Sequence, residues 1–345
     1  MNSDDVDFGD IVVNQPSLSA DGPKSNKPWK YLSRFEVTCQ DREKVVCPVY
    51  ANGRQQVPIQ ITIEARDEDD VVVDVNHSRL YLNLVSYEDA DVFPDGLGRS
   101  ATEDTRFKYN WQVGPAGAGE DAPGVLENSD RLNSAKQFVS ANKVGVYKLA
   151  ARCRSPDWVL FTTNTPNPSA GKFDSWVLVE AREPCAQAWD KFSMTRTDYI
   201  TGSEWDVDLY YIYFNVQNLT IEASIKYGSA GDDESHYSWI KDGRQTRHVA
   251  YPAGARRNVQ HNSCATSSKS IVIQTNLREG QATVARIREP DPCGNFTHNG
   301  VLMGYIDQNG NESKVAIKGS SNGNTLHLIN PNSKLEDSPD DVVDE

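Results

Sequence analysis

The sequence predicts an all-β protein that consists of two β-sandwich domains. Short stretches with an apolar residue at every second position recur along the chain, and this is the period of a half-buried strand. Gly, Pro, Asn, Asp or Ser bound these stretches, and helical periodicity is scarce. Many short strands separated by turns are typical of sandwiches and barrels. Because 345 residues are long for one core, we expect two domains.

The clearest element is a β-hairpin between Gln56 and Val75. Apolar residues alternate from Val57 to Ile63, the acidic turn Asp67–Asp70 interrupts them, and a β-branched run follows. Further strands are expected in short segments that read LYLNLVSY, VGVYKLAARC, WVLFTTNT, SWVLVEA, LYYIYFNVQ, LTIEASIKYG, SIVIQTNL, ATVARIRE, VLMGYIDQNG, KVAIKG and NTLHLIN. One helix is expected from Asn128 to Ala141, where Leu132, Ala135 and Phe138 share one face.

Two similar strand ends organise the chain. VLVEAREPC (Val177 to Cys185) and VARIREPDPC (Val284 to Cys293) each run into a proline, which cannot donate to a central ladder. We place a domain boundary after the first of them, between one domain at residues 29–183 and a second at residues 188–332. The ends, residues 1–28 and 333–345, are polar and acidic, and we expect both to be disordered tails.

The first domain contains a motif similar to the corner strand of immunoglobulin-like sandwiches. In NKVGVYKLAARC, a tyrosine follows a glycine and precedes alternating core positions that lead to a cysteine, namely Gly145, Tyr147, Leu149, Ala151 and Cys153. The alternative is an ordinary strand with a tyrosine at its entrance. We expect an immunoglobulin-like first domain and a second β-sandwich, which is jelly-roll-like or has the fold of the family that residues 205–300 resemble.

Charge and hydropathy limit the partners and the location. The formal net charge of −14, without a basic stripe, would repel a phosphate backbone, so we expect no nucleic acid partner. No run of about 18 apolar residues is present, so we expect no transmembrane segment. The first 30 residues lack the basic end and apolar stretch of a secretory signal peptide. We therefore expect a soluble protein that is cytoplasmic or is released by lysis or a dedicated export system.

No motif identifies an enzyme. The sequence contains no H-E-x-x-H, G-x-S-x-G or G-x-x-x-x-G-K-[ST] pattern, and we expect a noncatalytic protein without cofactor or metal. Cys264 and Cys293 are expected either to form a disulfide or to stay reduced on neighbouring strands. Zinc bound by these cysteines with His261 and His298 is the less favoured alternative, because the spacing matches no common zinc framework.

The strongest candidate for a binding surface is the segment Ser235–His261, here called the aromatic–basic segment. Aromatic rings beside cations suit a lipid headgroup, a glycan or an anionic surface. The alternative is a long connection with Trp239 packed inward and its charges solvated. The candidate binding residues are Tyr237, Trp239, Arg244, Arg247, Tyr251, Arg256 and Arg257.

The second domain also carries a family resemblance. A hydrophobic strand ends near Asn215 and Asn218, a second strand leads into a Gly-Asp turn, and the elements Asn262-Ser263-Cys264 and Cys293-Gly294 follow. In these elements residues 205–300 resemble the aegerolysin family of small β-sandwich proteins. The resemblance implies binding to membrane lipids and recruitment of a larger pore-forming protein. The chain departs from the family because no tryptophan follows Trp239 and the first domain has no counterpart.

These observations predict a noncatalytic β-rich binding protein, a toxin component that recognises a membrane lipid or glycan surface. A structural subunit of a phage-like particle or filament is the alternative, and an enzyme without a recognisable motif is the third hypothesis. The ligand, the disulfide pairing and the oligomeric state stay open.

Overall fold

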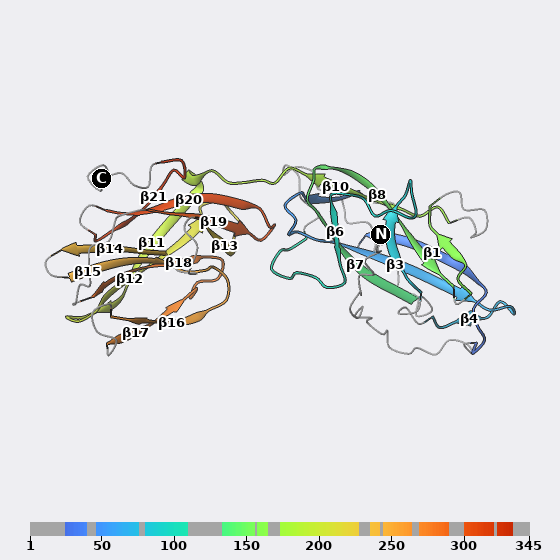
Figure 1. Ribbon diagram of the computed structural model, residues 1–345, viewed down its shortest axis with the longest axis horizontal. Helices are drawn as coiled ribbons and strands as arrows, with labels where there is room; N and C mark the ends of the chain where they lie inside the picture. Colours follow the sequence, from blue (N-terminus) through green and yellow to red (C-terminus); the bar gives the residue numbers. More distant parts are fainter. Residues whose placement is uncertain are drawn as a thin grey trace, which may run out of the picture. The chain divides into compact units, whose positions relative to one another are not determined.

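The computed structural model describes residues 25–39, 46–75, 80–109, 133–155, 157–164, 173–227, 235–241, 244–263, 269–289, 300–320 and 323–333. The described residues form strands and one short 3-10 turn, and no α-helix occurs among them, which confirms the predicted all-β class (Figure 1). The chain divides into two compact units, Met1–Pro184 and Cys185–Glu345.

The first unit is a sandwich of two sheets. In one sheet the strand order is β1-β3-β7-β6, with the short β4 paired to β3; the other has the order β2-β10-β8-β5, with β9 paired to β8. Every pairing is antiparallel except β2 with β10. The strands are β1 (Tyr31–Cys39), β2 (Val46–Tyr50), β3 (Val57–Arg66), β4 (Val72–Val73), β5 (Asn83–Ser86), β6 (Leu97–Ser100), β7 (Asn133–Ala141), β8 (Gly145–Arg154), β9 (Leu160–Thr162) and β10 (Val177–Arg182).

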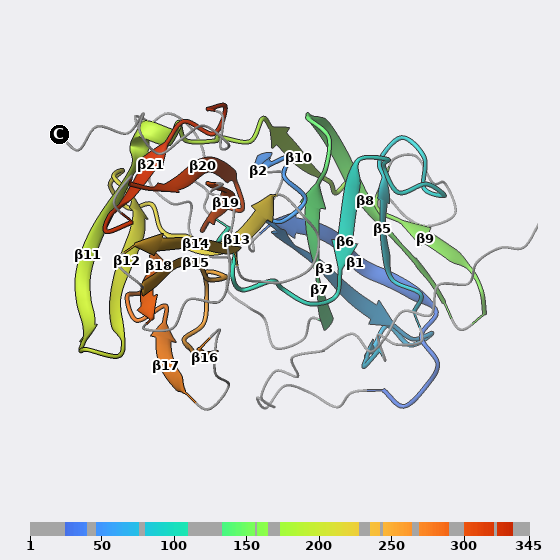
Figure 2. The ribbon, with the colours of Figure 1, turned by 60° about the vertical axis from the view of Figure 1, so that its left-hand side comes forward.

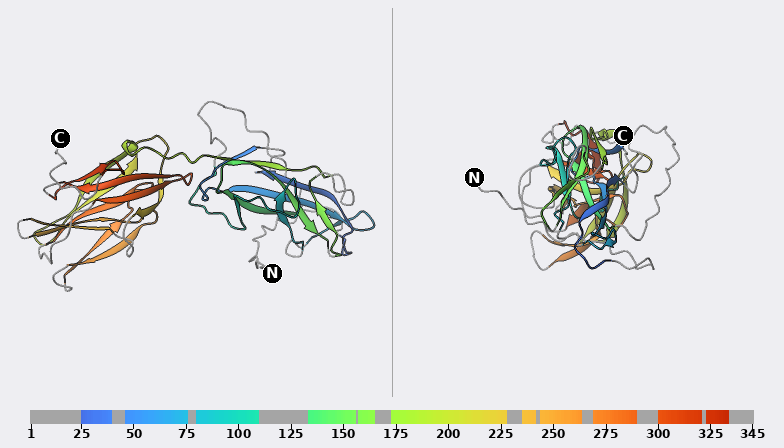
Figure 3. Two further views of the ribbon diagram at one scale, coloured as in Figure 1. Left: turned by 45° about the horizontal axis from the view of Figure 1, so that its top comes forward. Right: turned by 90° about the vertical axis from the view of Figure 1, so that its right-hand side faces the viewer.

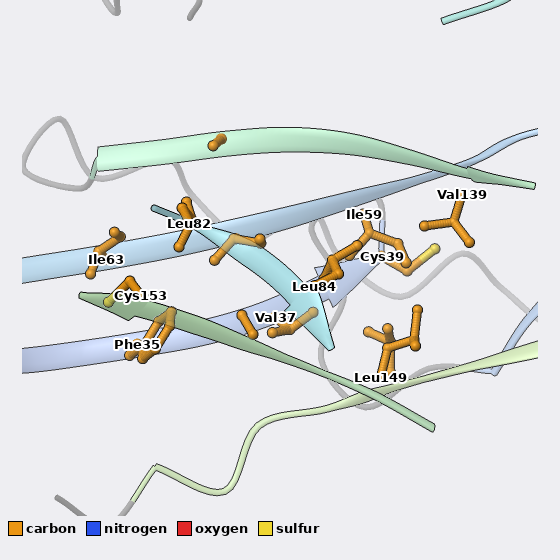
Figure 4. Packing of buried hydrophobic residues seen from close by; sticks show 14 of the residues in the cluster. Phe35, Val37, Cys39, Ile59, Ile63, Leu82, Leu84, Val139, Leu149 and Cys153 are labelled. Carbon is orange, nitrogen blue, oxygen red and sulfur yellow. The ribbon is translucent and has the colours of Figure 1, made fainter. Parts of the chain in front are cut away.

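The core of the first unit lies between its two sheets. Alternate side chains of β1 and β3 meet alternate side chains of β5 and β8, as the labelled residues of Figure 4 show. Phe35, Ile59 and Ile63 come from one sheet, and Leu84 and Leu149 come from the other. The alternation predicted for this region therefore decides which face of each strand is buried.

The hairpin predicted between Gln56 and Val75 is confirmed, because β3 pairs antiparallel with β4 across the acidic turn. The predicted tail of residues 1–28 is too long at its end. Ser25 forms a bridge with Val73, and Lys27 pairs with Glu68 and Asp69. Residues 1–24 of that tail, and all but Ser333 of the predicted C-terminal tail, lie outside the described residues.

The predicted helix over Asn128–Ala141 is wrong, because residues 133–141 form the strand β7. β7 lies between β3 and β6, and its Ala135, Gln137, Val139 and Ala141 are buried in strict alternation. The predicted helical face joins Ala135 with Phe138, which lie on opposite faces of the strand, and the buried alanines and glutamine give little sign of the period of two. β7 is a strand because it pairs with both β3 and β6, and this tertiary context outweighs the local helical pattern of its sequence.

The second unit contains two sheets and a separate hairpin. The strand orders are β11-β12-β18-β15-β14 for the first sheet and β13-β19-β20-β21 for the second, and β16 pairs with β17. The long hairpin of β11 and β12 is visible in Figure 2. The strands are β11 (Phe192–Thr201), β12 (Asp206–Phe214), β13 (Ile221–Tyr227), β14 (Ser235–Lys241), β15 (Arg244–Ala250), β16 (Arg257–Asn262), β17 (Ser270–Thr275), β18 (Ala282–Glu289), β19 (Val301–Asp307), β20 (Glu312–Gly319) and β21 (Leu326–Ile329).

In the five-stranded sheet of the second unit, the central strands β12, β18 and β15 are buried on both faces. Ile212 and Phe214 of β12 pack into a cluster with residues of β19 and β20. Val207 and Leu209 of the same strand pack into a second cluster with Ile273 of β17. The unit therefore has three layers, with the β16–β17 hairpin on the side opposite the four-stranded sheet (Figures 1 and 3).

In the two similar segments VLVEAREPC and VARIREPDPC, the strand ends before the proline, as the sequence predicts. β10 ends at Arg182, two residues before Pro184, and β18 ends at Glu289, directly before Pro290. A strand that the sequence did not indicate follows the first proline. After the 3-10 turn η2 (Trp189–Lys191), β11 runs along the edge of the five-stranded sheet with few buried residues, so its alternation is weak.

Two-sided burial of β12 gives a direct test. Leu209→Ala and Ile212→Ala remove side chains from opposite faces, and each should lower the free energy of unfolding by about 2 to 5 kcal/mol. Val272→Ala, at an exposed position of β17, should change it by less than about 0.5 kcal/mol. Urea denaturation of the intact chain measures all three. A loss confined to one of the two β12 variants would contradict the three-layer arrangement.

Candidate functional site

The aromatic–basic segment forms a hairpin and the start of a second one. Tyr237 and Trp239 lie on β14, opposite His248 and Thr246 of β15, and Arg244 begins β15. The side chains of residues 235–245 fall outside the described part of the structure, so a binding role for Tyr237, Trp239 and Arg244 stays a prediction.

Two of the proposed binding residues serve the core of the second unit. Arg247 Nε lies 2.8 Å from Oε1 of the fully buried Glu289, and its Nη2 donates to the carbonyl of Asn262. Tyr251 is 1% exposed, and its hydroxyl lies 2.7 Å from Nε2 of the buried His261. Tyr251 is thus placed inside the unit, away from a surface ligand, because its ring completes the packing against β17.

Arg256 and Arg257 are exposed at the beginning of β16. Arg256 Nη2 donates to the carbonyl of Leu277, which holds the guanidinium against the neighbouring loop. Of the predicted residues with described side chains, two are therefore exposed and two are largely buried. Tyr251 is thus not available to a surface ligand, and a binding role for Arg256 and Arg257 stays a prediction.

The cysteines of the described residues differ in their exposure. Cys264 and Cys293 lie outside them, as does His298, so the predicted disulfide stays a prediction. Cys39, Cys47 and Cys153 are buried thiols, and Cys185 is an exposed one. Burial raises the pKa of Cys153 to about 12, which keeps it protonated and unreactive. Among the described residues, no group of three or more His, Cys, Asp or Glu is arranged to hold a metal ion.

An exposed pair of aromatic residues stands out in the first unit. Tyr81 precedes β5 and is 60% exposed, and Trp158 lies between β8 and β9 and is 63% exposed. Their ring centroids are 5.4 Å apart, with an angle of 32° between the ring planes. The guanidinium of Arg154 lies over the Trp158 ring, 5.8 Å from its centroid. We call Tyr81, Trp158, Arg154 and the exposed Asp157 the aromatic platform.

The backbone of this platform is unusual. Five non-glycine residues in the described structure have positive φ, and three of them are Asp or Asn, which tolerate this region. Tyr81 and Trp158 are the other two, with φ of 46° and 63°. For a bulky residue such a conformation costs on the order of 1 to 3 kcal/mol, and it persists only where the surroundings impose it. The fold therefore holds both aromatic residues in conformations that they would not adopt alone.

Hydrogen bonds fix the turn that carries Trp158. The amide of Ser155 donates to the carbonyl of Val159, and the amide of Trp158 donates to the carbonyl of Ser155, both over 2.9 Å. Ser155 Oγ accepts the amide of Val159 over 3.0 Å. The amide of Arg154 donates to the carbonyl of Leu80 over 2.8 Å, which ties this turn to the residue before Tyr81. The two rings are thus joined through backbone contacts as well as through their own packing.

A second aromatic cluster lies on the outer face of the same sheet. Lys148 Nζ is 3.3 Å from the ring centroid of Tyr87 and 4.5 Å from that of Trp176. The Tyr87 hydroxyl donates to Asp174 Oδ1 over 2.9 Å. In this cluster the Lys148 ammonium lies over the faces of the Tyr87 and Trp176 rings, and both rings are only partly exposed. The cluster consequently presents less open ring surface than Tyr81 and Trp158.

The buried charges of the second unit stabilise its sheets. Arg286 Nη1 lies 2.6 Å from Asp208 Oδ2 and also contacts Asp206, and its Nε donates to the carbonyl of Gly323. Burial raises the pKa of Asp208, and the positive charges of Arg286 and Arg196 oppose that shift. This network links β12 and β18 to the loop before β21, so its groups are engaged in structure.

Sequence reasoning missed the aromatic platform. Its two rings are distant in the chain, and only the pairing of β5 with β8 brings them together (Figure 2). One signal was present in Ser155-Pro156-Asp157-Trp158, a turn-forming sequence with a tryptophan at its end.

The turn between β19 and β20 predicts a pH effect on stability. Asp307 is buried there, its Oδ1 accepts the amides of Asn309 and Asn311, and burial raises its pKa to about 6. The folded chain therefore keeps this proton between about pH 4 and 6, where the unfolded chain releases it. The stability contributed by this group is complete below about pH 4 and is lost as the pH rises to 6.

Asp307→Asn carries no charge and keeps the accepting oxygen. Its free energy of unfolding relative to wild type should rise between about pH 4 and 6, by at most roughly 3 kcal/mol, and then stay level. Urea denaturation of the intact chain at several pH values measures this. Glu279→Gln, at an exposed position, is the control and should run parallel to wild type. A constant difference between Asp307→Asn and wild type across this range would contradict the prediction.

No family model matches the chain, and no curated protein matches it, so the aegerolysin resemblance stays a prediction. In the described structure no helix has both the length and the apolarity needed to cross a bilayer. Among solved structures the chain is similar to the adhesin InvE of Yersinia pseudotuberculosis, at 9% identity and a TM-score of 0.20, over 88% of this chain. It spans 64% of that adhesin chain, and nothing about a ligand follows at this TM-score.

Proposed function

We propose that the protein is a noncatalytic β-rich binding protein that recognises a glycan or lipid surface and that its first unit carries the recognition site. The observation that carries this proposal is the exposed pair of Tyr81 and Trp158. Full burial of one such side chain stabilises a fold by about 1.5 to 3 kcal/mol, and this fold leaves most of both side chains in water. A ligand that covers the rings gains as affinity the part of that free energy that exceeds the entropic cost of association.

The strand order of the first unit supports an immunoglobulin-like module. In that fold the first, second, fifth and fourth strands form one sheet, and the third, sixth and seventh form the other. The orders β1-β3-β7-β6 and β2-β10-β8-β5 match this plan when β2 is the continuation of the first strand. The Tyr147 hydroxyl donates to the carbonyl of Lys143 over 3.0 Å, as the corner tyrosine of such domains does. Such a frame commonly presents binding surfaces, but the ligand depends on the site.

A binding screen of the intact chain tests this proposal. The probes are an immobilised glycan panel and vesicles of phosphatidylcholine with or without anionic lipids or glycolipids. We expect saturable binding to at least one of these probes, and we expect Trp158→Ala to weaken it, because the ring provides much of the apolar contact. Failure to bind any glycan or vesicle would overturn the proposal.

A further inference from the structure

We infer that the aromatic platform binds a neutral sugar ring, with the apolar face of the sugar on Tyr81 and Trp158 and its hydroxyl groups on Arg154 and Asp157. The inference rests on the proposed function and names the class of ligand for that site. The sugar could belong to a protein-linked glycan or to a glycolipid headgroup, since both present the same ring.

The geometry provides both halves of such a contact. Two exposed rings with centroids 5.4 Å apart form an extended apolar surface, and the negative π faces attract the C–H bonds of a sugar ring. The Arg154 guanidinium has several N–H donors, and the exposed Asp157 carboxylate accepts hydrogen bonds. A sugar needs this combination, because each of its hydroxyl groups both donates and accepts.

The charges of the platform decide against other ligands. A quaternary ammonium headgroup on Tyr81 and Trp158 would lie close to the Arg154 guanidinium, which carries the same charge and would repel it. The base of a nucleotide also stacks on aromatic rings, but the phosphates of that nucleotide would meet a chain with a net charge of −14. Arg154 and Asp157 have opposite charges, so a ligand without net charge fits the platform best.

The backbone that carries Tyr81 and Trp158 is held in place before binding, and this raises the affinity that two rings can give for a sugar. The hydrogen bonds of Ser155, Trp158 and Val159 hold the turn before any ligand arrives. Binding then orders few side chains, and less of the contact energy is lost to conformational entropy. The positive φ of Tyr81 and Trp158 also favours binding, because the folded chain holds both residues in this strained backbone conformation before the ligand binds.

The experiment measures saccharide binding by the intact chain and by four variants. Tyr81→Ala and Trp158→Ala remove one ring each, and Trp158→Phe keeps a ring. Trp189→Ala is the matched control, since Trp189 is an exposed tryptophan of the second unit outside the platform. The probes are the neutral sugars of a glycan panel and phosphatidylcholine vesicles with and without a neutral glycolipid. Urea denaturation of each variant verifies that it is folded.

We expect each alanine variant to weaken sugar binding at least about tenfold. Trp158→Phe should retain part of the affinity, and Trp189→Ala should match wild type. Sugar binding that survives both alanine substitutions would overturn this inference and the placement of the site at Tyr81 and Trp158, but glycan recognition by the chain would stand. Binding that needs the two rings but occurs on plain phosphatidylcholine vesicles would overturn the ligand class alone. No binding to any probe would overturn the inference together with the proposed function.

Discussion

The aromatic platform depends on the burial of one face of β8. Leu149, Ala151 and Cys153 point into the core without exposure, and this fixes the register of β8 against β5 and β10. A shift by one residue would turn these side chains to water and bring charged residues inward, at a cost of several kcal/mol. The fixed register places the turn after Arg154 beside Leu80. Apolar burial in the sandwich thereby determines the position of polar and aromatic groups at its end.

The second unit uses the same principle on a sheet with two buried faces. Alternate residues of β12 pack into two separate hydrophobic clusters. Nearly every side chain of the strand is therefore apolar or bound to another side chain of the unit. Its charged residue Asp208 is tolerated in this layer because Arg286 and Arg196 neutralise it. Removal of one of these three residues leaves an uncompensated buried charge, so the three charges stabilise the sheet only together. The same demand explains why Arg247 and Tyr251, which look like surface residues in the sequence, are engaged inside the unit.

The sequence was sufficient to predict elements whose period was strong. The hairpin around Asp67–Asp70 and the strand ends before Pro184 and Pro290 follow from alternation and from the missing donor of proline. β7 was missed because its buried positions hold alanine and glutamine, which carry little hydropathy signal. The site was harder, because Tyr81 and Tyr251 occupy similar apolar surroundings in the sequence and differ only in what covers them. The meeting of Tyr81 with Trp158 requires the sheet topology and could not be read from either segment alone.

Hydrogen–deuterium exchange of the intact chain, with and without the saccharide that binds most tightly, tests the central claim most directly. The account predicts that the ligand slows exchange at the amides of residues 80–82 and 157–160, which surround the aromatic platform, and leaves the rest of the first unit unchanged. It also predicts no change in the aromatic–basic segment. Slower exchange within residues 235–262, with residues 80–82 and 157–160 unaffected, would contradict the account and return the binding site to the second unit.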